Sequence, residues 1–358
     1  MDRQKARKNQ RKAFIALLLI LCLIMNVSTA CQFSSGMKRY EIQYFDVFNT
    51  VTTLIVYTES EEEFKRQSEV IYSELKLYHM LYDIYHDYEG INNIKTINDW
   101  AGQKPVTVDK KVTDLLKLAK EMYEKTDGKV NIAYGSVLSI WHKYRTEGLS
   151  DPDKARLPDK KELEKAANFT DIDKIQIDEV ASTVYLQEKE MSLDVGAIGK
   201  GYAAQMAANA GKEAGMTSFL LNVGGNIVTE GTRGDGSPWT LGIQNPDTDS
   251  NEAYVLKVRL NGDTLVTSGN YQRFYEVNGK KYHHIINPDT GMPADYFASV
   301  SIITKDSGIA DALSTAIYNM PLEQGMKLVE SMENTEVVWI LEDGKKFYTN
   351  GLKKYLIE

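Results

Sequence analysis

The sequence contains almost no cysteine. Its 358 residues include only Cys22 and Cys31, and both lie near the N-terminus. The folded part of the chain therefore has no disulfide framework, no thiolate zinc site and no cysteine nucleophile. A basic stripe is also missing, and the net charge of −8 argues against binding to a nucleic-acid backbone. The composition, 42% hydrophobic and 26% charged without repeats or low-complexity segments, is that of a globular protein.

The N-terminus resembles the signal of a bacterial lipoprotein. Basic residues from Arg3 to Lys12 precede an apolar run, Ala13 to Val27, of about 15 residues, which is short for a membrane-spanning helix. The run ends in Ser28-Thr29-Ala30-Cys31, and lipidation would make Cys31 the mature N-terminus. A plain signal anchor with an incidental cysteine is the alternative. We expect a signal peptide over residues 1–30, a tether over 31–40 and one domain over 41–358, held by lipid at the extracytoplasmic face of the cell membrane.

Helices and strands are predicted beyond the tether without a regular alternation. Tyr40 to Tyr57 is dense in β-branched and aromatic residues, which predicts strand structure. Ser60 to Glu63 matches a capping box at the start of a helix, and a second helix, beginning near Asp109, is expected to end at Gly128. Arg145 to Asp159 is polar and contains two prolines, which predicts a surface excursion.

The second half of the chain is predicted to continue in the same mixed way. We expect strands at about 175–186, 219–229, 239–244, 253–260, 299–304, 337–341 and 346–349, and helices at about 201–214, 309–319 and 322–332. Because no βαβ alternation is present, the predicted fold class is α+β, with mixed sheets and packed helices.

A glycine-rich segment, Asp194-Val195-Gly196-Ala197-Ile198-Gly199-Lys200-Gly201-Tyr202, leads from a strand into an alanine-rich helix. Glycines let a ligand approach the backbone and a helix N-terminus favours anions, so Lys200 is a candidate partner for a phosphate. The segment matches neither a Walker A loop nor the G-x-G-x-x-G fingerprint. Taken alone, such a segment is more often a tight connection, and Asn222-Val223-Gly224-Gly225-Asn226 alone predicts only a β-turn.

Two adjacent histidines, His283 and His284, precede the strong turn signal Asn287-Pro288-Asp289-Thr290-Gly291 and follow another polar segment, Thr267-Ser268-Gly269-Asn270-Tyr271. In strand geometry the two rings point to opposite faces, so at most one of them faces a given site. Catalytic side chains often lie where a strand ends. By themselves, these histidines favour ordinary packing or surface positions for both rings.

Asp311-Ala312-Leu313-Ser314-Thr315-Ala316 places a carboxylate and a hydroxyl four residues apart. On a helix Asp311 and Thr315 share one face, and their oxygens are hard ligands that suit Mg²⁺. A partly buried Asp that caps the helix start is the competing interpretation of this segment.

Together and in this order, these segments resemble the ApbE family, the FAD:protein FMN transferases. The resemblance also includes Thr126 to Asn131, with Gly135 and Trp141 after it, and it extends from about Phe45 to the end of the chain. It implies a single ApbE or T-fold-like catalytic unit that uses Mg²⁺ and transfers the FMN half of FAD to a Thr or Ser hydroxyl of an acceptor protein. AMP is released.

The resemblance also implies which residues form the site. The catalytic histidine corresponds to His284, which would take the proton of the acceptor hydroxyl. The metal ligands correspond to the carbonyl of Ala197 and the side chains of Asp311 and Thr315. Contacts to the flavin nucleotide fall on Asp194 and Lys200, with Phe48, Tyr85, Lys129, Val130, Asn131 and, for the ring, Tyr271 as further candidates. Asn131 and Asn287 stand where many members have Asp, so each keeps the oxygen but loses the charge.

Other functions remain open from the sequence. An FAD pyrophosphatase would use the same site with water in place of the acceptor hydroxyl. A lipoprotein that only binds FAD would need no base beside a metal, so His284, Asp311 and Thr315 together argue against it. A solute-binding lipoprotein unrelated to flavin would leave the Asp-x-x-x-Thr and Gly-Lys-Gly segments unexplained. No acceptor-like segment is evident in this chain, so the expected acceptor is another protein.

Overall fold

The computed structural model describes residues 36–357. The chain divides into two units, Met1–Met37 and Lys38–Glu358, and every element named below belongs to the second. Cys31, the predicted signal peptide and most of the predicted tether lie outside the described residues. The last residues of that tether, Lys38–Tyr40, belong instead to the first strand. Between residues 36 and 357, no helix is long and apolar enough to cross a membrane.

The centre of the fold is an eight-stranded sheet in which all neighbouring strands are antiparallel. In spatial order its strands are β1 (Lys38–Tyr44), β2 (Thr52–Thr58), β6 (Phe219–Val223), β7 (Asn226–Glu230), β10 (Thr264–Gly269), β15 (Ser299–Thr304), β16 (Glu336–Ile340) and β17 (Lys346–Tyr348). β2 therefore pairs with a strand far away in the sequence, which joins the two halves of the chain.

The strands contribute alternate side chains to two separate cores. In β16, Val337 and Trp339 join the larger core, whereas Val338 and Ile340 join a smaller core on the other face. This alternation follows from the two-residue period of a strand. Because both faces are covered, β15 and β16 are buried along their whole lengths, and their sequences are apolar or small almost throughout.

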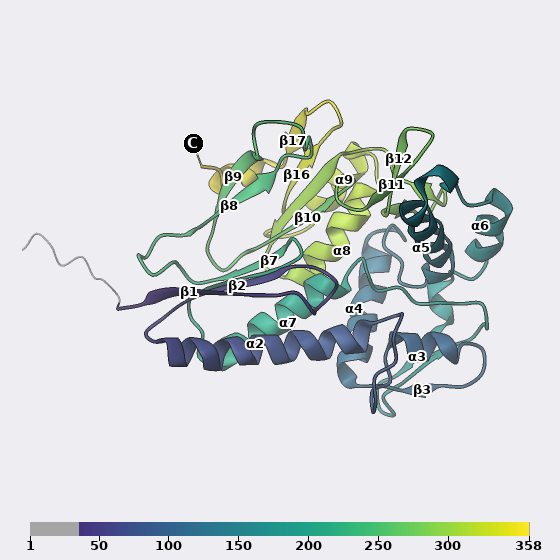
Figure 1. Cartoon of the computed structure of the whole chain (residues 1–358), viewed down its shortest axis with the longest axis horizontal. Coiled ribbons are helices and arrows are strands. Elements are labelled where there is room, and N and C mark those ends of the chain that lie inside the picture. The colour runs from purple at the N-terminus through teal and green to yellow at the C-terminus, as the bar shows by residue number, and fades with distance from the viewer. Residues whose placement is uncertain (1–35, 358) are drawn as a thin grey trace, which may run out of the picture. The chain divides into compact units, whose positions relative to one another are not determined.

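The helices that contribute to the larger core include α2 (Glu61–Tyr82), α7 (Gly199–Glu213) and α8 (Ser307–Tyr318). Their positions beside the sheet can be followed in Figure 1. α7 and α8 approach each other very closely at Gly201. A Cβ atom on that glycine would lie 2.2 Å from the carbonyl oxygen of Ser307 and 2.5 Å from Cβ of Asp311. Gly201 therefore sets the separation of the two helices and with it the position of Asp311.

Gly201→Ala is expected to lower the free energy of unfolding by about 1–3 kcal/mol, because the added methyl group has no space unless α8 moves. The same movement would displace Asp311, which the resemblance places in the expected metal site, so weaker binding of FAD is the expected second effect. Urea unfolding and a titration with FAD measure the two effects. The matched control is Glu213→Ala, at an exposed position at the end of the same helix. Equal stability of the Gly201→Ala and control proteins would contradict the role assigned to this glycine.

The opposite face of the sheet carries the hairpin of β8 (Trp239–Gln244) and β9 (Tyr254–Leu260), together with η3 (Asn350–Lys354). A third cluster of buried side chains joins α5 (Gly135–Ser150) to the hairpin of β11 (Phe274–Val277) and β12 (Lys280–His283). The remaining elements are α3 (Ile94–Asp99), β3 (Val106–Thr107), α4 (Lys110–Lys125), η1 (Pro152–Lys154), α6 (Lys160–Ala167), η2 (Ile172–Lys174), β4 (Ile175–Asp178), β5 (Thr183–Leu186), β13 (Ile286–Asn287), β14 (Met292–Pro293) and α9 (Leu322–Glu330).

The predicted α+β class is confirmed, whereas α4 ends at Lys125, three residues before the predicted stop at Gly128. That glycine has a φ of 75°, and its N–H donates to the carbonyl of Tyr123 over 2.9 Å, as expected at a helix C-terminus. The predicted capping box is only half present. Ser60 accepts the N–H of Glu63, but the Glu63 carboxylate binds Arg66 and Gln67 instead of returning to the cap.

The prediction of a surface excursion at Arg145 was wrong in its first part, because α5 continues to Ser150. Its apolar anchors, Val137 and Trp141, lie upstream of the polar residues and pack into the third cluster with Tyr275. Gly148 lies directly against the Tyr275 ring, so the helix stays attached to the fold although its outer face is polar. The predicted strand at 40–57 was also too long, since residues 45–51 form a turn between β1 and β2.

Candidate active site

A cavity of about 640 Å³ lies where the end of the sheet meets α2, α5, α7 and α8. This volume is within the usual range for a small-molecule or cofactor site. Its wall includes every residue of the described part that we predicted for catalysis, cofactor binding or metal binding: Phe48, Tyr85, Lys129, Val130, Asn131, Asp194, Ala197, Lys200, His284, Asp311 and Thr315. Tyr271, the further candidate for the flavin ring, is not part of the wall; its ring packs over Gly269.

Asp311 and Thr315 lie one turn apart on α8 and face the cavity together. Oδ2 of Asp311 accepts the N–H of Gly201 over 2.8 Å and lies 3.6 Å from Nζ of Lys200. Burial raises the pKa of Asp311, while the charge of Lys200 and the hydrogen bond from Gly201 act in the opposite direction. A buried carboxylate in this state gains from any further cation that reaches it.

The donor set suits a hard divalent ion. Among residues 36–357, neither the carbonyl oxygen of Ala197 nor the hydroxyl of Thr315 has a hydrogen-bond partner. With the Asp311 carboxylate they offer three oxygen donors of three kinds, which fits the few protein ligands that Mg²⁺ takes. No cluster of three or more His, Cys, Asp or Glu side chains that would hold a metal occurs in this part of the chain.

His284 follows β12 and borders the same cavity, where its ring is held by Arg273. The backbone N–H of His284 donates to the Arg273 carbonyl over 3.1 Å, and Nδ1 lies 3.2 Å from the same oxygen. Because a carbonyl can only accept, this contact places the ring proton on Nδ1 and leaves the lone pair on Nε2. Burial, followed by the charges of Arg273 and Arg145, lowers the pKa of His284 to about 3, so the ring is neutral at physiological pH.

His283 points the other way, as strand geometry predicts. Its ring is buried, Nε2 lies 2.6 Å from the carbonyl oxygen of Ala294, and Nδ1 accepts the N–H of Ile285. The ring also packs edge-on against Tyr318. Both nitrogens are therefore occupied by the fold, which leaves His284 as the member of the pair that is available to a ligand.

Phe48 lies in the turn between β1 and β2 at a corner of the cavity. Phe48 and Asn49 have φ values of 55° and 50°, a left-handed conformation that is uncommon for residues with side chains. The Phe48 N–H donates to Nδ1 of His79, and the two rings meet edge to face. Such strain often accompanies a binding site. Here it fixes an aromatic ring at the edge of the cavity.

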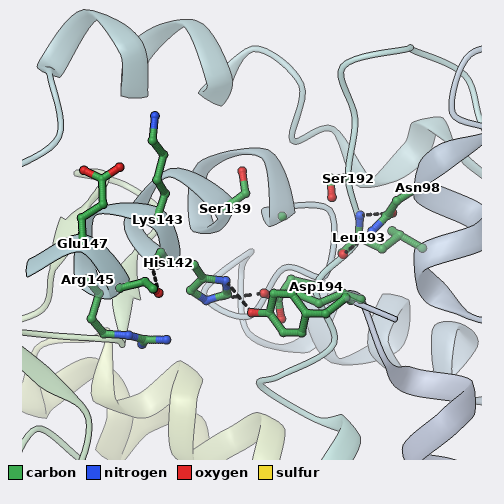
Figure 2. A pocket seen from close by; sticks show the side chains of 13 residues that line it. Asn98, Ser139, His142, Lys143, Arg145, Glu147, Ser192, Leu193 and Asp194 are labelled. Atoms are coloured by element: carbon green, nitrogen blue, oxygen red, sulfur yellow. Dashed lines mark hydrogen bonds and ion pairs between the residues drawn. The ribbon is translucent and has the colours of Figure 1, made fainter. Parts of the chain in front are cut away.

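Tyr85, His142 and Asp194 form a chain across the wall of the cavity. The Tyr85 hydroxyl lies 3.1 Å from Nδ1 of His142, whose Nε2 lies 3.8 Å from Oδ2 of Asp194. Behind this chain lies a second cavity of about 450 Å³, and Figure 2 shows His142 and Asp194 pointing toward each other in its wall. The two cavities share Ile84, Tyr85, His142, Arg145 and Asp194.

Residues 129–131 border the cavity, but the polar side chains of this segment already have partners within the protein. The Lys129 ammonium is paired with Asp289. Asn131 uses its amide nitrogen on the carbonyl of Thr170 and its oxygen on the N–H of Ala133. Asn287 is likewise occupied, since its oxygen accepts the N–H of Asp289 within the turn. An amide suffices for these local contacts, and none of them requires the carboxylate that many members of the family have at these positions.

Several cavity residues were not predicted from the sequence: His142, Arg145, Asn226, Arg273 and Asn319. Arg145 was assigned to a surface segment and His142 was not considered. The side-chain oxygens of Asn226 and Asn319 are buried and have no partner in the described part of the chain. Asn319 continues the four-residue spacing of Asp311 and Thr315 along one helix face, and this spacing is the signal that would have identified it.

The chain was compared with known proteins. The model of the ApbE family matches residues 48–339. An FAD:protein FMN transferase of Klebsiella pneumoniae (strain 342) is 31% identical over 253 residues, which are 70% of this chain and 76% of the relative. One of Treponema pallidum (strain Nichols) is 33% identical over 274 residues, 72% of this chain and 73% of the relative.

Solved structures show the same fold. The ApbE protein of Thermotoga maritima superposes with a TM-score of 0.78 at 27% identity, covering 90% of this chain and 100% of the other. The flavin transferase ApbE from Vibrio cholerae gives a TM-score of 0.74 at 22% identity, with 89% and 100% covered. With the family model spanning most of the described residues, and with a cavity that collects the matched residues, this chain belongs to the ApbE family.

Proposed function

We propose that the protein transfers the FMN half of FAD to a Thr or Ser hydroxyl of another protein, in the presence of Mg²⁺, and releases AMP. The observation that carries this proposal is the position of His284. A neutral ring with an available Nε2 borders the same cavity as Lys200, Asp311 and Thr315. The relatives named as FAD:protein FMN transferases support the same activity.

The side chains divide the reaction between them. Nε2 of His284 takes the proton of the acceptor hydroxyl while that oxygen attacks the phosphorus on the flavin side of the pyrophosphate. The bond from this phosphorus to the bridging oxygen breaks, and AMP leaves with that oxygen. Lys200 and the N-terminus of α7 favour the negative phosphoryl oxygens. Phe48 and Tyr85 offer aromatic surface to the flavin ring.

Asp311, Thr315 and the Ala197 carbonyl are the residues that would hold Mg²⁺. The ion, when bound, supplies positive charge that stabilises the phosphoryl oxygens as charge builds on them. Asp311 is prepared for this role because it is buried and held in place by Gly201 and Lys200.

One experiment separates transfer from the two nearest alternatives. The full chain, in detergent, is incubated with FAD, Mg²⁺ and a flavin-acceptor domain, and the acceptor is examined for in-gel fluorescence and a mass gain of one FMN. Transfer predicts both, with one AMP released for each label. AMP and FMN without a labelled acceptor would show a pyrophosphatase, and bound FAD without products would show a binding protein.

We also propose that Cys31 carries lipid and holds the protein at the extracytoplasmic face of the cell membrane. The support is the short apolar run followed by small residues and a cysteine. Fractionation of cells that produce the Cys31→Ala chain tests it. Retention of the lipid-modified mass in this variant would contradict the proposal.

A further inference from the structure

Two arginines in the cavity lack a counter-ion. The guanidinium groups of Arg145, on α5, and Arg273, directly before β11, both border the cavity. Over residues 36–357 neither has a hydrogen bond or an ion pair through its side chain, and no dashed line reaches the Arg145 guanidinium in Figure 2. The two lysines of the same cavity do have carboxylate partners, Lys129 with Asp289 and Lys200 with Asp311.

The two arginines repel each other in the absence of an anion. Arg145 is half-buried, and its pKa is lowered by burial and by the neighbouring charge of Arg273. Arg273 is exposed, and the carboxylate of Asp194 attracts Arg145 without forming an ion pair with it. An anion that joins the two guanidinium groups would relieve the repulsion between them. The planar, permanently charged guanidinium group is well suited to a phosphate, which it binds through two hydrogen bonds.

The pair lies next to the reacting groups. The carbonyl of Arg273 is the oxygen that holds the ring of His284, and the charges of both arginines reach that ring. An anion held by the pair is therefore close to the proton acceptor. Arg273 is also near enough to Asp311 for its charge to act on that carboxylate, so the arginine pair and Lys200 border one region of the cavity. The pyrophosphate of FAD has two phosphates. The flavin-side phosphate is attacked, and the other leaves as part of AMP, so each needs its own stabilising cations.

We propose that Arg145 and Arg273 form an oxyanion site for the phosphate of the leaving nucleoside monophosphate. The proposal rests on the transfer reaction given above. When the acceptor oxygen bonds to the flavin-side phosphorus and the bridging bond breaks, the bridging oxygen leaves with AMP, and the acceptor proton passes to His284. The AMP phosphate thereby gains one negative charge. Two unpaired guanidinium groups stabilise this charge more than that of the intact dinucleotide, so the pair favours the departure of AMP.

The test is binding of AMP and adenosine to the full chain in detergent, measured by calorimetry with and without Mg²⁺. Wild type is expected to bind AMP much more tightly than adenosine. Arg145→Gln and Arg273→Gln should each weaken AMP binding by about 10- to 100-fold without changing the affinity for adenosine. The matched control is Arg233→Gln, an arginine that contacts Tyr57 and is not part of the cavity wall.

Stability and kinetics complete the test. Because each substitution removes an unpaired charge, the melting temperature is expected to stay the same or rise, so a loss of AMP binding is not a loss of folding. In transfer assays the variants should lower kcat more than they raise KM for FAD. Unchanged AMP binding, or an effect confined to KM for the acceptor protein, would overturn the proposal, because the pair would then serve an acidic acceptor. AMP binding needs no acceptor, so a chain that binds AMP through this pair but never labels an acceptor keeps the site and overturns only the transfer function.

Discussion

The His284→Ala protein is expected to bind FAD nearly as well as wild type and to label an acceptor about 10²–10⁴ times more slowly. The ring is held by Arg273 through Nδ1, so its removal leaves a space at the cavity wall but breaks no buried contact of the core. Fluorescence titration with FAD and single-turnover labelling of the acceptor measure the two quantities. Full labelling by this variant would show that His284 is not the base.

The neighbouring histidine provides the matched control. His283→Gln removes a ring that contacts Ala294, Ile285 and Tyr318, so it should lower the melting temperature. The rate of labelling per folded molecule should remain that of wild type, because this ring does not face the cavity. The opposite result, a stable His283→Gln protein without transfer, would exchange the roles of the two histidines.

The low pKa of His284 leads to a prediction for the dependence of the reaction rate on pH. With a pKa of about 3 in the free protein, His284 remains neutral as the pH falls, and kcat/KM should show no acidic limb near 6.5 from this group. Bound pyrophosphate offsets the cationic charges that help to lower this pKa, so the pKa in the complex is higher. The acidic limb of kcat is therefore expected at a higher pH than that of kcat/KM. Coincident limbs in both profiles would contradict this coupling.

Asp311→Asn is expected to abolish the response to Mg²⁺ and to reduce transfer by about 10²–10³-fold. The amide can still accept the N–H of Gly201, so the contact between α7 and α8 is kept while the charge is lost. Without Mg²⁺ the variant should melt at the same temperature as wild type or higher, since burial disfavours the carboxylate. Wild type should melt at a higher temperature when Mg²⁺ is added, and the variant should not.

Asp306→Ala separates this effect from damage to the helix. Asp306 caps α8 by accepting the N–H of Ile309, and its loss should cost about 1 kcal/mol of stability. The increase in melting temperature on addition of Mg²⁺ should persist in that protein. A persistent response to Mg²⁺ in the Asp311→Asn protein would place the ion elsewhere.

Local features were predicted best where the geometry of a helix or strand alone fixes which residues lie on one face. The four-residue interval between Asp311 and Thr315 is such a case, because helix geometry alone places both on one face. Gly128 and the alternation of His283 and His284 were equally predictable, since each depends on a backbone conformation that adjacent residues determine. The strands in the second half of the chain were predictable in the same way, because runs of β-branched residues favour strand structure.

The missed features depend on contacts between distant segments. Arg145 lies in a polar stretch, and the helix that carries it is held by packing against residues such as Tyr275, more than a hundred residues later. The role proposed for Arg273 depends on its position beside Arg145 and His284. No local sequence pattern indicates that these residues lie together. The contact of Asn131 with Thr170 likewise appears only when the chain is folded.

The pairing of β2 with β6 determines when during folding the chain becomes able to bind FAD. β2, residues 52–58, can pair with β6 only after residues 219–223 have been synthesised. The residues of the cavity wall are likewise spread along the chain, from Phe48 to Asn319. Contacts of such long sequence separation form slowly, and no short nascent segment contains a binding surface. A chain exported unfolded therefore cannot carry FAD with it. For the exported lipoprotein that we propose, FAD would be needed in the compartment where folding is completed.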